Sequence, residues 1–142
     1  MIAGLDWAAI AWALFALFGV STIGGLVFGM GLSMDALRGI EDRDRLRGDQ
    51  IDEKMDERLD AALLDRTTQI QLVALTFGAA LVGGAVVALR APAAPLANAA
   101  VVAGIAALAN FIPLGGTVPR RVQVAGFVAS ALGVMGAAIV LS

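Results

Sequence analysis

The residues of this chain that could do chemistry are concentrated in one short segment. Between Arg38 and Arg66 lie 17 of its 22 charged residues, ten of them acidic and seven basic. Acidic clusters of this kind can bind metal ions, and arginines can bind phosphates. The 142-residue chain has no His, Cys or Tyr. Imidazole bases, thiolate nucleophiles, disulfides and the usual zinc ligands are therefore excluded.

A calcium loop is the first chemistry that the segment suggests. Asp42, Asp44 and Glu53 fall at positions 1, 3 and 12 of such a loop. However, Leu46 stands where a ligand is needed, and Arg47 stands where the loop requires glycine. We expect no metal site and no cofactor.

Phosphate binding is the second chemistry. Arg43, Arg45 and Arg47 alternate along the chain, but acidic residues outnumber basic ones in the segment. Binding to nucleic acid needs a basic surface, so we expect no nucleic-acid partner. No catalytic motif is present, and we expect no enzyme activity.

The rest of the chain is apolar enough to lie within a lipid bilayer. Its hydrophobic fraction is 59% and its mean hydropathy is +0.85, against about 45–50% apolar residues in soluble domains. A soluble chain of this length could not bury so much apolar surface in one core. We predict an all-α integral membrane protein with a single domain and four transmembrane helices, at about residues 7–34, 70–89, 96–112 and 122–141.

The predicted spans carry no Asp, Glu, Lys or Arg in their interiors. Proton relays and ion-coupling sites use such residues, so coupled transport is disfavoured. Lys and Arg number nine on one side of the four spans and one, Arg90, on the other. The positive-inside rule then places residues 35–69 inside and both termini outside, in a cell membrane or a virion envelope.

Small residues suggest how the spans pack. In the first span one face carries Ser21, Gly25, Gly29 and Ser33 at four-residue spacing. Such faces let helices approach closely, within one chain or between copies, and we expect a homo-oligomer or an assembly with other membrane proteins. Later spans show similar patterns, which also arise by chance in a chain with 17 Gly. Asn110 is predicted to hydrogen-bond between helices.

The charged segment itself is predicted to form a helical stem. Gly48 ends its first part, and Asp49 is the candidate N-cap of a helix that continues without a break as far as Phe77. The first two spans would then extend as a charged helical hairpin on the inner side. One apolar stripe follows this helix at four-residue spacing: Ile51, Met55, Leu59 and Leu63. The stripe could pack on the end of the first span, lie on the lipid surface, or dock a partner.

The layout of four charge-free spans with an Asp- and Arg-rich inner loop resembles the small internal membrane proteins of pleomorphic viruses that infect salt-loving archaea. That resemblance covers the whole chain in layout, contains no motif, and implies an envelope-organising role beside a spike protein. The nine Arg against one Lys and nine Asp against three Glu fit a high-salt interior, or a genome rich in G and C. We expect a structural membrane protein; the alternative is an oligomeric, holin-like pore or an accessory subunit of a transport complex.

Overall fold

The computed structural model describes residues 4–40, 45–112 and 118–142, and these residues form helices joined by turns. In chain order the helices are α1 (Trp7–Arg38), α2 (Gly48–Leu64), α3 (Arg66–Arg90), α4 (Pro95–Ala109) and α5 (Arg120–Leu141). Three of them, α1, α3 and α5, are long and apolar enough to cross a membrane. The fourth apolar helix, α4, has 15 residues and is shorter.

Local signals in the sequence explain where these helices begin and end. Asp6 caps α1, because its Oδ1 accepts a hydrogen bond of 3.0 Å from the backbone N–H of Ala9. Pro95 occupies the first turn of α4, where the missing N–H of proline has no helical partner to lose. Asn110 ends α4, since its Nδ2 donates back to the carbonyls of Ala106 and Ala107 at 2.9 and 3.4 Å. The predicted third span is therefore shortened at this end.

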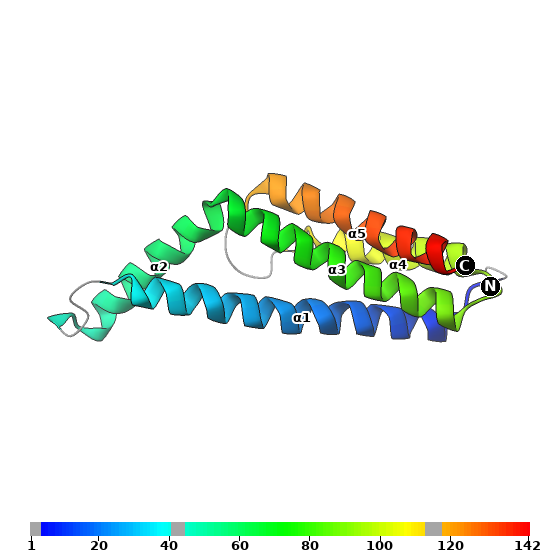
Figure 1. Ribbon diagram of the computed structural model, residues 1–142, viewed down its shortest axis with the longest axis horizontal. Helices are drawn as coiled ribbons and strands as arrows, with labels where there is room; N and C mark the ends of the chain where they lie inside the picture. Colours follow the sequence, from blue (N-terminus) through cyan, green and yellow to red (C-terminus); the bar gives the residue numbers. More distant parts are fainter. Residues whose placement is uncertain (1–3, 41–44, 113–117) are drawn as a thin grey trace.

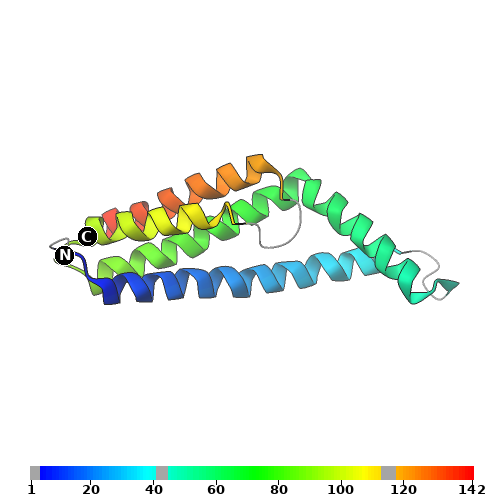
Figure 2. The ribbon, with the colours of Figure 1, turned by 180° about the vertical axis from the view of Figure 1, so that it is seen from behind.

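The predicted continuous helix from the charged segment into the second span is wrong. Asp65 interrupts it with an extended backbone, at φ −66° and ψ 137°. Its carboxylate accepts hydrogen bonds from the backbone N–H groups of Thr67 and Thr68, at 2.8 and 3.2 Å. Asp65 thus ends α2 and caps α3, so that α2 turns away from the direction of α3 toward the end of α1 (Figures 1 and 2).

The helices form an elongated bundle with α3 at its centre. Helix α3 contacts α1, α4 and α5, and α4 also packs along α5. Both termini lie at one end of the bundle, and α2 lies at the other (Figure 1). Near the termini α1 and α3 are close together, and they separate toward α2, which bridges their distant ends (Figures 1 and 2).

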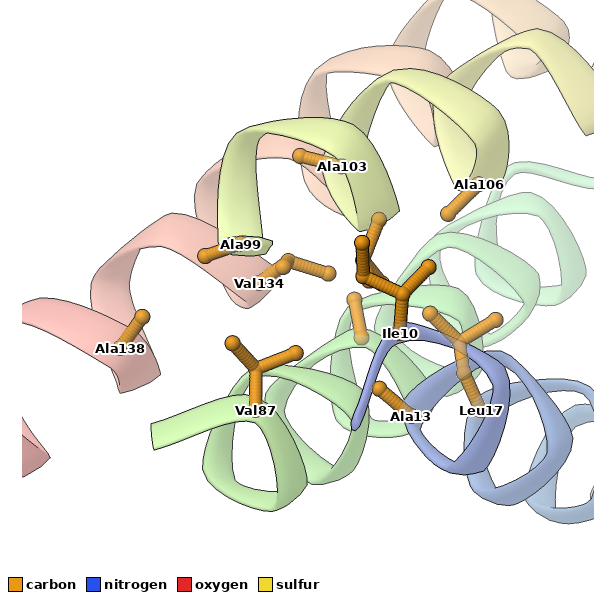
Figure 3. Packing of buried hydrophobic residues seen from close by; sticks show 11 residues of the cluster. Ile10, Ala13, Leu17, Val87, Ala99, Ala103, Ala106, Val134 and Ala138 are labelled. Carbon is orange, nitrogen blue, oxygen red and sulfur yellow. The ribbon is translucent and has the colours of Figure 1, made fainter. Parts of the chain in front are cut away.

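The core lies in the half of the bundle that holds the termini. It consists mainly of Ala and Val, with Ile10 and Leu17 contributed by α1 (Figure 3). Val87, Val102 and Val134, from α3, α4 and α5, are completely buried. Because these side chains are small, neighbouring backbones approach closely, which is how membrane helices gain van der Waals contact.

Two polar contacts connect α1 to the rest of this core. The fully buried Asn98 accepts a 2.8 Å hydrogen bond at Oδ1 from the backbone N–H of Asp6, and its Nδ2 donates to the carbonyl of Ala94. Arg90 lies over the ring of Trp12, with Cζ 4.9 Å from the ring centroid. A cation over an indole face is attracted to its π electrons, so this contact links α1 to α3 near the termini.

Candidate functional site

The charged helix α2 is one of two features that could carry a function. It begins at Gly48, with Arg47 as the preceding residue, whose backbone N–H donates to Gln50 Oε1 at 3.1 Å. The predicted N-cap, Asp49, instead lies in the first turn, where its negative charge complements the helix dipole. Helix α2 begins earlier than predicted because the side chain of Gln50 accepts the hydrogen bond of the Arg47 backbone N–H, so that Asp49 is not needed as the N-cap.

The apolar stripe of α2 is only partly covered. Its members are all half-buried, and no residue of α2 is fully buried: Ile51, Met55, Leu59 and Leu63. Ala36 and Ile40, at the end of α1 that contacts α2, are buried. The guanidinium of Arg58 packs against Gly39, beside the negative end of the α1 dipole. One side of α2 therefore rests on α1, and its acidic residues are exposed.

The predicted helix-packing face of α1 lies along a groove between α1 and α3, which is described below. Within one copy, a Cβ atom added at Gly25 or Gly29 would meet nothing within 4 Å among the described residues. Ser21 and Ser33 are half-buried. Ser21, Gly25 and Gly29 line the groove. These small residues leave space beside α1, whatever role they have between copies.

The closest contacts between helix backbones occur between α3 and α5. The small-residue patterns of these two helices are of the kind that also arises by chance in a chain with 17 Gly. A Cβ at Gly84 would collide with the carbonyl oxygen of Val134, and one at Gly133 would collide with the carbonyl oxygen of Phe77. Each glycine thus admits the backbone of the other helix. The signal was present in the four-residue spacing of Ala80, Gly84 and Ala88, but spacing alone does not identify the partner helix.

The groove is the second feature. It has a volume of about 780 Å³ and lies where α1 separates from α3, with walls from all five helices. Most of its lining is apolar, and six polar uncharged side chains interrupt it: Ser21, Thr22, Thr76, Asn110, Gln123 and Ser130. The sequence shows these as isolated polar residues, and the packing of the helices brings them to one groove.

Asn110 and Ser130 connect two walls of the groove. Asn110 Nδ2 donates to Ser130 Oγ at 3.0 Å, which confirms the predicted hydrogen bond between helices. Gly126 lies against the amide oxygen of Asn110, and any side chain there would displace it. Thr76 is also partnered, because its hydroxyl donates to the carbonyl of Leu72 at 2.9 Å. Asn110, Ser130 and Thr76 are therefore held in place by hydrogen bonds.

Ionisable side chains lie at the edges of the bundle. The backbone N–H of Thr68, together with that of Thr67, lowers the pKa of Asp65 below its usual range, because both stabilise the charged carboxylate. Among the described residues no group of three or more His, Cys, Asp or Glu side chains is placed to hold a metal ion. Asp42 and Asp44, which fall at positions 1 and 3 of the calcium-loop pattern, lie outside the described ranges.

Searches against protein-family models, curated proteins and solved structures find no significant match to this chain. The features of this chain that bear on function are therefore α2, the groove and the apolar helices.

Proposed function

We propose that the chain is a non-enzymatic structural protein of an envelope or a larger membrane assembly. Four helices, α1, α3, α4 and α5, would cross the membrane, and α2 would dock a partner on the inner side. The observation that carries this proposal is the position of α2. Its 17 residues include none that is fully buried, and it lies at the end of the bundle away from both termini (Figure 1).

The composition of α2 indicates the kind of partner. This helix has six acidic and two basic side chains. Asp52, Asp56 and Asp60 recur at four-residue spacing and are exposed, so they share one face of the helix. A partner with a basic surface would be attracted to this face and kept in register by it. The half-buried stripe would add apolar contact at its border.

The tightly packed core favours a structural role over a pore within one copy. Val87, Val102 and Val134 fill the space between α3, α4 and α5. A water-filled path along this bundle would have to displace them and lose their packing, whereas a scaffold gains from a rigid core. The layout of the sequence, which resembles that of the small internal membrane proteins of pleomorphic viruses of salt-loving archaea, supports the same role.

Site-specific photocrosslinking in the native membrane tests the docking surface. A photoreactive amino acid at Glu57, an exposed residue of α2, should give one discrete adduct with a second protein. The same amino acid at Ala93, exposed in the turn at the opposite end, is the matched control and should not give that adduct. Changing Asp52, Asp56 and Asp60 together to Asn should reduce the adduct severalfold, because it removes the charge while keeping side-chain size.

Two results would contradict the proposal. The first is an absence of any adduct from α2 positions when the chain is present at its normal level. The second is an adduct that neither the Asn substitutions nor replacement of Ile51, Met55 and Leu59 by Gln weakens. Leu63 is left unchanged because it also lines the groove.

A further inference from the structure

The groove between α1 and α3 has the shape of a chain-binding site. Its lining on α1 extends from Leu17 to Leu32, which at about 1.5 Å per residue is roughly 22 Å of helix. One leaflet of the hydrocarbon core is only about 15 Å thick. The groove is therefore long enough to hold an extended acyl chain along its full depth in one leaflet.

The size of the groove is that of a small-molecule site. Its volume is about 780 Å³. A ligand of the ordinary small-molecule range, roughly 300–1,000 Å³, fits this space. A narrow, flexible hydrocarbon chain matches both its length and its mostly apolar walls.

The charge at the end of the groove indicates the head group. Val118 and Val122 line the groove, and Arg120 and Arg121 lie between them in the chain, exposed in the first turn of α5. Cations are unfavourable at a helix N-terminus, because the dipole is positive there. Two arginines in the first turn of α5 are therefore locally unfavourable, and residues that are unfavourable for local structure occur at functional sites. An anion bound there would resolve the conflict.

Other groups at this end favour the same ligand. Helix α5 follows Pro119 and has no side-chain cap. The backbone N–H groups of Val122 and Gln123 donate to the Pro119 carbonyl, which leaves those of Arg120 and Arg121 to bind an anion. Helix α3, whose first residue is Arg66, begins at the same end of the bundle as α5 (Figure 1). Gln123 lines the groove one turn further in, and its side-chain amide has no hydrogen-bond partner among the described residues. Asp65, the acidic residue next to Arg66, accepts hydrogen bonds at its Oδ2 from the backbone N–H groups of Thr67 and Thr68, which hold this carboxylate against the first turn of α3.

We propose that the groove binds one acyl chain of an anionic phospholipid, whose phosphate lies at Arg120, Arg121 and the N-terminus of α5. The inference rests on the proposed placement of α1, α3 and α5 in a membrane, and it is independent of docking at α2. A bound lipid would fill the space between α1 and α3 and fix the angle at which α1 leaves the bundle. It would thereby set the position of α2.

Native mass spectrometry of the detergent-purified chain tests this proposal. Phosphatidylglycerol and phosphatidylcholine with identical acyl chains separate head-group charge from hydrocarbon, and glycerol phosphate tests the anion without the chains. We expect one phosphatidylglycerol to bind more tightly than phosphatidylcholine, and glycerol phosphate not to bind. Changing Arg120 and Arg121 to Gln should weaken the binding of phosphatidylglycerol about 30-fold, because each arginine contributes about a fivefold gain in affinity for an anionic lipid.

Bulky substitutions test the groove itself. Gly25→Phe places a ring in the groove, since a Cβ there meets no atom within 4 Å, and should abolish lipid binding. Gly29→Phe is a second such variant. Gly104→Phe is the matched control, because that glycine is open and exposed on α4, outside the groove. Circular dichroism should show the same helix content in each variant that is compared.

The arginine control is the double change of Arg38 and Arg47 to Gln, which removes two exposed charges outside the groove and should leave binding unchanged. Equal binding of phosphatidylglycerol and phosphatidylcholine would overturn the proposal. Full lipid binding by Gly25→Phe and Gly29→Phe would also overturn it. A change of oligomeric state in these variants without loss of lipid would overturn it as well, because the groove would then be an interface between copies. The α2 crosslinks are measured separately, so failure of one proposal does not imply failure of the other.

Discussion

At the scale of single residues, the buried and half-buried polar side chains act mainly as connectors. Asn98 holds the start of α1 against α4, Asn110 joins α4 to α5, and Asp65 forms the junction of α2 and α3. Each side chain satisfies backbone groups that would otherwise lack partners at a helix end or in the core. The sequence identifies such residues by type, and the partner of each depends on the fold.

Asp65 gives the junction of α2 and α3 a dependence on pH. Its folded pKa lies below its ordinary value of about 3.9. The stability that it contributes is therefore present above that value and is lost as the pH falls through the lower, folded pKa. In detergent, the melting temperature of wild type should exceed that of Asp65→Ala at pH 7, and this difference should shrink below about pH 4.

Two variants separate capping from charge at this junction. Asp65→Asn keeps a capping side chain, and so should melt closer to wild type than Asp65→Ala at pH 7. Asp56→Asn, an exposed carboxylate within α2, controls for loss of one charge. A melting-temperature difference between wild type and Asp65→Ala that stays constant from pH 7 to pH 2 would show that the carboxylate does not support the junction.

At the scale of helices, packing depends on which small residues actually face a neighbour. Charge-free runs predict where α1, α3 and α5 lie to within about four residues. The break at Asp65 was missed because it involves neither Gly nor Pro, although an Asp before two threonines is a typical N-cap. The spacing of small residues did not distinguish Gly84, which admits the backbone of α5, from Gly25, which borders the groove.

Substitution of Gly84 tests the close contact between α3 and α5. Gly84→Ala places a methyl group against the Val134 carbonyl and the Ala137 side chain. Overpacking of this kind costs about 1–3 kcal/mol, which should appear as a lower midpoint of unfolding in denaturing detergent. Gly78→Ala on the same helix is the control, since its Cβ meets no described atom within 4 Å. Equal midpoints for the two variants would mean that α3 and α5 are not in such close contact.

At the scale of the whole molecule, the arrangement combines a filled core at one end with an open groove at the other. Composition and charge distribution predict the helical membrane class, because they reflect the solvent of each segment. The groove could not be predicted, because it depends on the angle between α1 and α3, and no local pattern encodes that angle. The short α4 raises the remaining question of topology: 15 residues cover about 22 Å, against about 30 Å of hydrocarbon.

Single-cysteine labelling measures whether α4 crosses the membrane. The chain has no native Cys, so each introduced thiol reports one position to an impermeant maleimide. With four crossings, Ala93→Cys and Ser142→Cys should react from outside, and Glu53→Cys and Val118→Cys only after permeabilisation. All four positions are exposed. If α4 did not cross, the cysteines at positions 93 and 118 would both react with the maleimide from outside. The cysteine at position 142 would then react only after permeabilisation. Reaction of Glu53 from outside, with Ala93 and Ser142 protected, would instead reverse the orientation predicted from the nine inner Lys and Arg residues.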